Sequence, residues 1–345
     1  MKNKPQDPKS RRIGTVGGQA VLEGVMMKSK DRYSVAVRLE DGDIDITSER
    51  LVPLKNKYKI LGWPLIRGVV NFGEMLALSY KTLEISARAT GVEDEASETK
   101  FEKWLREKFG RGIVDVIMVI STILGVGLGL GLFFFLPSLV TKGIDILSGG
   151  SLGLARNLFE GVIKIGIFVG YIALVSLIPD IRRTFEYHGA EHKSIFCYES
   201  GEELTIENVK KYSRFHPRCG TSFLIVMLLI SVLLYSLPIF TWDNMLLRML
   251  TKLIFLPLLV ALGYEFIRYA GRHDNALVRA LSAPGLWMQR LTTREPDERQ
   301  IEVAIAALKS ALPEEFPGFS PEKKIKTVNQ VFAENGKANS DTANA

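Results

Sequence analysis

Three of the chain's four histidines and both of its cysteines lie in one segment, residues 185–221. On a helix, His188 and His192 would stand one turn apart on the same face, with Glu191 beside them. Two histidines at this spacing can bind Zn²⁺, and a neighbouring carboxylate can act as general base on a water molecule. The segment therefore predicts a zinc site at which Glu191 is the catalytic residue.

Several other side chains could complete the ligand set, and the spacing does not choose among them. Glu199 shares the helix face of the two histidines, while the others return later at the ends of apolar segments. The candidates are Glu199, His216, Cys219 and Glu265. The alternative to a metal site is that both histidines and Glu191 only form hydrogen bonds with polar loops at a membrane surface.

The histidines require a helix to bring them onto one face. We expect Asp180, which follows Pro179, to cap a helix over residues 181–199, and Gly201 to end it. The order His-x-x-Glu-His is also that of the inverted zincins. Those are larger soluble proteases, so the similarity extends to the ligand chemistry and not to the fold.

Four long apolar runs dominate the rest of the chain, at residues 113–136, 158–178, 222–240 and 247–267. Each is close to the ~20 residues that cross a hydrocarbon layer of ~30 Å. The sequence predicts a polytopic α-helical membrane protein with about four transmembrane helices, the first of them ending at Pro137. Glycines in the first run would permit close helix packing, including a homo-oligomer.

The distribution of basic residues predicts the orientation. The loop at 137–157 contains two Lys or Arg residues and the loop at 241–246 contains none, whereas the loop at 180–219 contains seven. By the positive-inside rule, both termini and the histidine-rich loop face the cytoplasm of a multi-pass plasma-membrane protein. The net charge of +6 gathers beside the apolar runs. We therefore expect the lipid bilayer, and not nucleic acid, as the partner of these charges.

Composition and periodicity divide the chain into six parts. Strand-like alternation at 34–39 and 44–47, joined by a turn at Asp41-Gly42, predicts a β-rich module. Residues 61–85 favour an interfacial or re-entrant helix over a full span. The parts are a flexible basic arm (1–12), a small β-rich cytosolic module (13–57), amphipathic or interfacial and charged linker helices (58–112), a four-span membrane domain (113–269) that includes the cytosolic loop at 180–219, a helical cytosolic C-terminal segment (270–319) and a disordered tail (320–345).

Two functions from different classes fit these features. The first is a zinc-dependent, peptidase-like hydrolase at the cytoplasmic membrane face, acting on a membrane-embedded peptide or a lipid headgroup. The second is a non-enzymatic scaffold or assembly factor for other membrane proteins. A transporter is disfavoured because the charges in the apolar runs lie towards their ends, with Glu160 and Lys164 expected to pair at helical spacing.

Longer motifs carry a resemblance to a known family. They are Gly17–Met27, Tyr187–Lys193, His216–Ser222, Pro284–Trp287 and Leu291–Pro296. With these motifs the chain resembles the YqhQ family of bacterial membrane proteins over residues 13–312. The resemblance implies a membrane location and a family labelled as predicted metal-dependent enzymes, and it supplies no substrate.

Overall fold

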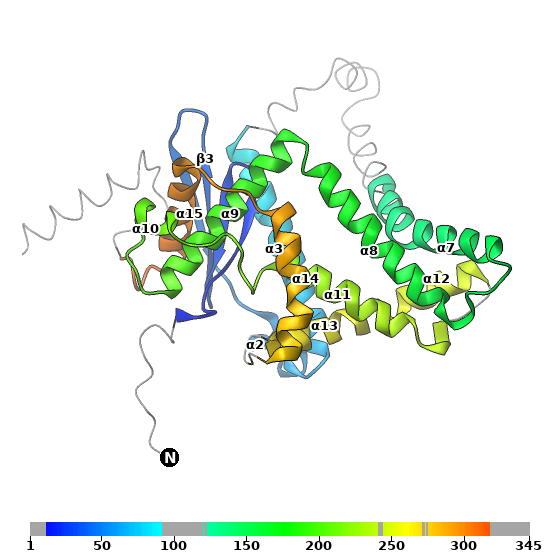
Figure 1. The fold of residues 1–345 in the computed structure, drawn as a ribbon. Helices are drawn as coiled ribbons and strands as arrows, with labels where there is room; N and C mark the ends of the chain where they lie inside the picture. Colours follow the sequence, from blue (N-terminus) through cyan, green and yellow to red (C-terminus); the bar gives the residue numbers. More distant parts are fainter. Residues whose placement is uncertain are drawn as a thin grey trace, which may run out of the picture.

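The computed structural model describes residues 12–91, 120, 123–240, 244–270, 273 and 275–317. It contains a module built on a small sheet, and a set of apolar helices that extends away from it (Figure 1). Nearly all of the predicted basic arm, the charged part of the linker, the beginning of the first predicted span and the predicted tail lie outside the described residues.

The sheet has four antiparallel strands in the order β1-β2-β3-β4. They are β1 (Gly17–Val21), β2 (Gly24–Lys28), β3 (Arg32–Arg38) and β4 (Ile44–Arg50). The predicted hairpin joins β3 to β4, and Gly42 adopts the left-handed conformation in its turn, with φ of 89°. The alternation of residues 34–39 and 44–47 thus identified two strands, whereas the glycine-rich stretch 17–28 forms a second hairpin that the sequence did not predict.

Helices cover both faces of this sheet. On one face α9 (Pro179–Glu199) and α15 (Glu298–Ala311) share a core with Val25, Met27 and Ala36. On the other face α3 (Ile66–Ala89) packs Leu78 against the opposite set of strand residues. Because both faces are covered, β3 is buried along most of its length instead of alternating between core and solvent. The small module is thus enclosed by helices from three distant segments of the chain.

The helix that carries the histidines differs from expectation only at its start. Pro179 occupies the first turn and Ile178 is the N-cap, so Asp180 lies inside the first turn and does not cap the helix with its side chain. A proline is well suited to that position because its missing N–H has no partner in a helix's first turn. At the other end Gly201 has φ of 75° and donates its N–H to the carbonyl of Tyr198 at 3.0 Å.

Two apolar helices are long enough to cross a membrane, and a bent pair could be a third. The first comprises Ile123–Leu147, and the second is α8 (Arg156–Val175). The pair is α12 (Met245–Ile254) and α13 (Leu256–Ala270), which meet at 44°. The predicted third span is shorter, because α11 ends at Tyr235 after 16 residues, about 24 Å of helix. Helices that could span a membrane are therefore present as predicted, whereas the number of four is not established.

The first of these helices continues through Pro137, where the sequence predicted its end. A π-helical turn, η2 (Gly131–Phe135), precedes α7 (Leu136–Leu147), and Pro137 lies in the first turn of α7. A wider turn changes the hydrogen-bonding register, so the proline is accommodated without breaking the helix.

Lys252 of α12 replaces Lys164 as the partner of Glu160. The side chains of Glu160 and Lys252 form a buried ion pair between α8 and α12. Lys164 instead lies over the rings of Phe134 and Tyr235, with its Nζ 5.1 and 5.5 Å from their centres. Helical spacing alone could not identify a partner that comes from another helix.

Two further helices join the module to the apolar bundle. The first is α3, whose beginning packs against α13 and whose later turns pack against the sheet. It is not one of the helices that could span a membrane. The second, α14 (Ala276–Thr292), crosses α11 (Gly220–Tyr235) and ends beside α9. The remaining short elements are α2 (Leu54–Lys57), η1 (Lys59–Gly62), η3 (Gly153–Ala155), α10 (Ile206–Lys210) and η4 (Pro238–Phe240).

Candidate metal centre

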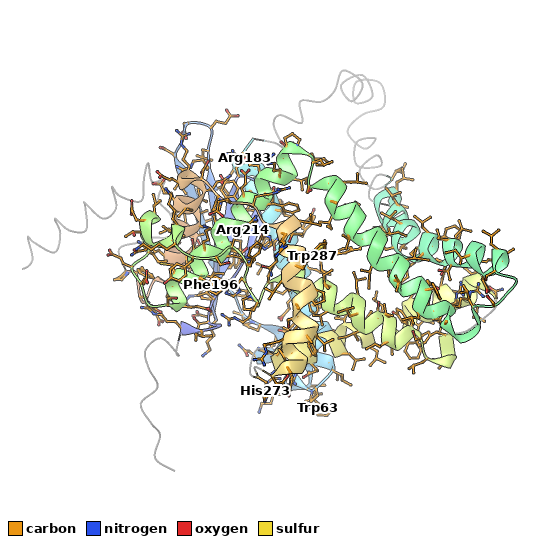
Figure 2. The ribbon with its side chains drawn as sticks, in the orientation of Figure 1. Trp63, Arg183, Phe196, Arg214, His273 and Trp287 are labelled. Carbon is orange, nitrogen blue, oxygen red and sulfur yellow. The ribbon has the colours of Figure 1, made fainter. Side chains whose placement is uncertain are left out.

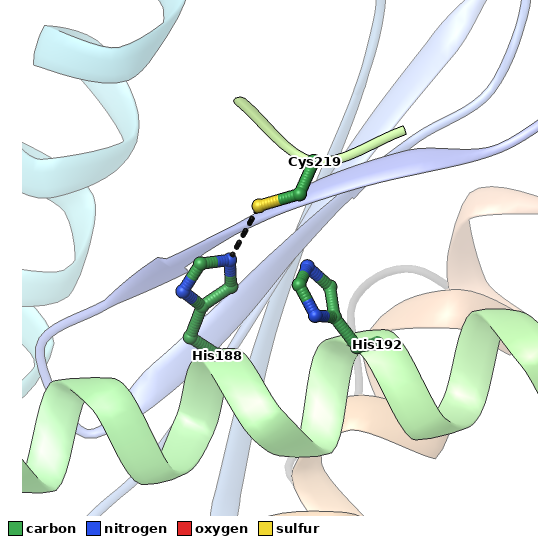
Figure 3. Close-up of side chains that lie close together, drawn as sticks. All are labelled: His188, His192 and Cys219. Carbon is green, nitrogen blue, oxygen red and sulfur yellow. Dashed lines mark hydrogen bonds between the residues drawn. The ribbon is translucent and has the colours of Figure 1, made fainter. Parts of the chain in front are cut away.

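Two histidines of one helix and a cysteine at the start of another point towards one another (Figure 3). His188 and His192 come from successive turns of α9, and Cys219 is the N-cap of α11. One ligand atom from each side chain lies within 4.8 Å of the other two, and the Nε2 of His188 is 3.2 Å from the Sγ of Cys219. Within the described residues this is the group of three His, Cys, Asp or Glu side chains able to hold a metal ion.

Hydrogen bonds to backbone carbonyls fix the tautomer of both rings. The Nδ1–H of His188 donates to the carbonyl of Thr292 at 2.8 Å, and that of His192 donates to the carbonyl of Arg214 at 2.5 Å. A carbonyl oxygen can only accept, so each Nδ1 carries the proton and each Nε2 presents a lone pair. Such a partner behind the ligating nitrogen is the usual arrangement of histidines that bind metals.

The Nε2 of His192 has no hydrogen-bond partner although the side chain is 1% exposed. Burial lowers the pKa of His192, and the proximity of His188 lowers it further. Burial alone would raise the pKa of the Cys219 thiol, but the proximity of His192 and hydrogen bonds with Thr221 hold it below its ordinary value. Both shifts favour a divalent transition metal, because its ligands must be a neutral imidazole and a deprotonated thiol.

Glu191 lies at the edge of this group. Its side chain is buried, its Oε2 has no hydrogen-bond partner, and that atom is 4.0 Å from the Nε2 of His188. Burial raises the pKa of Glu191 to about 8, an effect that His188 opposes and Cys219 reinforces. The carboxyl group packs on β1, where a Cβ on Gly18 would come within 2.7 Å of its Cγ. Gly18 is therefore the residue that makes room for Glu191.

The segment that follows α14 holds α9 in place. A Cβ on Gly189 would lie 2.0 Å from the carbonyl oxygen of Arg294, so the segment can cross α9 closely only at a glycine. The N–H of Arg294 donates to the carbonyl of Phe185 at 2.8 Å, and Glu295 pairs with the buried Lys193. This crossing places the carbonyl of Thr292 behind His188. The sequence did not predict this crossing, although Gly189 and the segment Leu291–Pro296 both belong to the motifs named above.

His216 and Glu199 lie next to the three converging side chains but form their own group. The rings of His192 and His216 have centres 5.5 Å apart, yet the Nε2 of His216 lies 3.8 Å from the Oε2 of Glu199. Glu199 is bound by the guanidinium of Arg218 and accepts the N–H of Gly14 at 2.7 Å. Although burial alone would raise the pKa of Glu199, these partners hold it below the ordinary carboxyl value.

Glu265, the last predicted ligand, lies elsewhere. Its two oxygens accept bidentate hydrogen bonds of 2.7 and 2.5 Å from Arg67 of α3. The structure thus brings together His188, His192 and Cys219 with Glu191 beside them. It places His216 and Glu199 in a neighbouring pair, and it uses Glu265 to join α13 to α3.

The comparisons with known proteins agree with the resemblance seen in the motifs. Residues 63–314 match a family described as "Protein of unknown function (DUF1385)". The chain is 33% identical over 300 residues to the Bacillus subtilis (strain 168) protein named "Uncharacterized protein YqhQ". That alignment covers 86% of this chain and 92% of the relative. No solved structure gives a significant match. Neither the family nor the relative has an assigned activity in its description, so the metal-dependent label implied by the resemblance has no support from these matches.

Proposed function

We propose that this chain, which belongs to the DUF1385 family of proteins of unknown function, is a zinc-dependent hydrolase. The observation that carries the proposal is the convergence of two lone-pair nitrogens and one sulfur, with both imidazole rings oriented by backbone carbonyls. A group that served only to fill a core would not leave the Nε2 of a buried histidine without a partner.

The donor set suits zinc. Cys and His are its preferred ligands, and three protein ligands with one open position are typical of catalytic zinc sites. Tetrahedral zinc bonds of ~2.0–2.3 Å place neighbouring ligand atoms ~3.3–3.6 Å apart. The three atoms lie within 4.8 Å of one another, so modest rotation of the side chains would bring them to that separation.

The roles of the residues follow from their positions. Zinc would supply a Lewis acid that polarises the scissile group and acidifies water. Glu191, whose Oε2 lies 4.0 Å from the Nε2 of His188, would act as general base. In the reaction the hydroxyl of one water molecule joins the electrophilic atom of the substrate, and the bond to the leaving group breaks. The proton taken up by Glu191 then passes to that leaving group.

The proposed topology places this site at the cytoplasmic face. In this topology the chain crosses the membrane outwards in Ile123–Leu147 and back in α8. It crosses outwards again in α11 and returns through α12 and α13. With four spans, both termini and α9 lie in the cytoplasm. The loop that contains Arg182, Arg183 and Lys193 is then cytoplasmic, in agreement with the positive-inside rule. Cysteine accessibility labelling of Ser151→Cys and Ser200→Cys in intact cells tests this. Only the first variant should react with a membrane-impermeant maleimide.

Metal analysis of the purified full-length protein tests the zinc site. Wild type should contain about one zinc per chain, and the H188A/H192A double variant should lose at least nine-tenths of it. His273→Ala is the matched control, because His273 lies outside the group and is exposed. Glu191→Gln should keep the metal, because Glu191 is proposed as a base and not as a ligand.

Alkylation of the two cysteines provides an independent readout. Cys219 should be protected from iodoacetamide by zinc and exposed after chelation, whereas Cys197, which is fully buried, should be unreactive in both states. No transition metal in any of these proteins after zinc supplementation, with no change in the alkylation of Cys219, would contradict the proposal. The membrane scaffold would then be the better interpretation.

A further inference from the structure

A cavity of about 810 Å³ lies between α3, α11, α13 and α14. This volume is within the ~300–1,000 Å³ of pockets that bind small ligands. Most of its wall is apolar, with aromatic and branched side chains from all four helices. They include Phe72, Phe223, Val226, Phe266, Ile267 and Leu286.

One end of the cavity reaches the candidate metal centre. Pro217, Arg218, Cys219 and Gly220 line it there. The Sγ of Cys219 is directed towards the two histidines (Figure 3). A molecule that fills the cavity would therefore place one of its ends beside the proposed zinc ligand.

The charges that line the cavity all have one sign. They belong to Arg218, whose guanidinium also binds Glu199, and to Arg279, and among the described residues no Asp or Glu belongs to the lining. An apolar wall with cationic groups complements a molecule that has a long hydrocarbon part and an anionic head.

The surroundings indicate where such a molecule comes from. Large apolar side chains, among them Leu76 and Tyr80, are exposed on α3. Trp63 before the start of α3 and Trp287 on α14 are also exposed (Figure 2). Tryptophan is enriched at membrane interfaces, and Trp287 directly follows Leu286 of the cavity wall, which favours a position of the α14 wall at the level of the lipid headgroups.

We infer that this cavity binds an acyl chain of an anionic membrane phospholipid. Resting on the proposed function, we further infer that a lipid of this class is the substrate whose head is presented to the zinc site. The ester or phosphoester bond near the head would be cleaved, with the hydroxyl of water joining the acyl carbon or the phosphorus and the proton going to the leaving oxygen.

Retained lipid in variants of the full-length protein tests the binding site. The protein is reconstituted in nanodiscs of equimolar phosphatidylglycerol and phosphatidylcholine, extracted in detergent and separated by size exclusion. Bound lipid is then measured by mass spectrometry. Val226→Trp and, independently, Ser282→Trp would fill the cavity, while Leu224→Trp places the same bulk on the exposed side of α11.

Wild type, L224W and the H188A/H192A variant should each retain about one phosphatidylglycerol per chain, and the two cavity-filling variants at least tenfold less. Thermal melting of every variant shows that it is folded, and zinc content confirms this for all variants except H188A/H192A. Equal retention by V226W, S282W and L224W, or retention of phosphatidylcholine as strong as that of phosphatidylglycerol, would overturn the inference. Because the metal-free variant is expected to keep its lipid, failure of the zinc proposal and failure of lipid binding give different results.

Release of fatty acid or headgroup from phosphatidylglycerol tests the substrate assignment. Zinc-loaded wild type and L224W should release product, whereas E191Q, which is expected to retain both zinc and lipid, should release at least a hundredfold less. If wild type binds both zinc and phosphatidylglycerol and yet releases neither product, the lipid would be a ligand and not the substrate.

Discussion

Substitution of Gly189 by alanine would test how the fold supports the candidate metal centre. Gly189 lies between the two histidines of α9, on the side that faces the segment after α14. Alanine is the better helix former by about 1 kcal/mol, so the intrinsic preference of α9 favours the change. Only the close crossing of the segment opposes it.

The magnitude follows from the distances at that crossing. The new Cβ would lie 2.0 Å from the carbonyl oxygen of Arg294, and such contacts essentially never fall below 3.0 Å, so the two backbones must separate by about 1 Å. The hydrogen bonds from Arg294 to Phe185 and from His188 to Thr292 are each 2.8 Å long, and a shift of that size breaks them. Overpacking costs about 1–3 kcal/mol, and each lost bond about 1 kcal/mol. We expect a net destabilisation of about 2–4 kcal/mol.

Thermal melting and zinc competition measure the two consequences. A loss of this size corresponds to a decrease in Tm of roughly 3–6 °C for a chain of this length. Removing the carbonyl partner of a ligating histidine typically weakens metal affinity about 10–100-fold, which a chromogenic chelator can quantify. Gly73→Ala in α3 is the matched control, since no heavy atom lies within 4 Å of its new Cβ. It should leave zinc affinity unchanged and leave Tm equal or slightly raised.

A G189A protein that melts within 1 °C of wild type would refute the reasoning, because the crossing would then be free to open without cost. The melting result is informative whether or not metal binds. If G189A is destabilised as expected and keeps wild-type zinc affinity, the orienting role of Thr292 would be wrong while the packing argument would stand.

Two further variants probe the module. Gly18→Ala should lower Tm by roughly 1–4 °C, because its Cβ would meet the buried side chain of Glu191 at 2.7 Å; melting curves check this. Lys309→Met should stabilise the protein at pH 7, because burial lowers the pKa of Lys309 to about 8. The unfolded chain binds this proton more tightly, so wild-type stability rises between about pH 8 and 10.5. The gain in K309M, at most about 3 kcal/mol, should shrink over that window when melts are compared at pH 7 and 10.

Neighbouring and pH-matched controls make these two results decisive. Gly17→Ala has no heavy atom within 4 Å of its new Cβ, so a Tm as low as that of G18A would show a general effect of stiffening β1. For Lys309, a stabilisation that is the same at both pH values would mean that hydrophobic packing of methionine, and not removal of a buried charge, produces the gain.

Local sequence determined several elements of this protein. The alternation of residues 34–39 and 44–47 and the Asp41-Gly42 turn fixed one hairpin, and apolar length identified helices that can span a membrane. Helical spacing placed His188 and His192 on one face, which α9 confirms. These features depend on neighbours a few residues away, and the pattern of the chain records such neighbours directly.

Contacts between distant segments decided the rest. Cys219 reaches the histidines because it caps α11, which crosses α14, and Glu199 is held instead by Arg218. Gly18 and Gly189 show a role only once Glu191 and Arg294 are seen against them. The separation between such partners is set by how helices and sheet pack, not by their spacing along the chain. The sequence by itself therefore determined which residues could do chemistry, and the tertiary structure decided which of them meet.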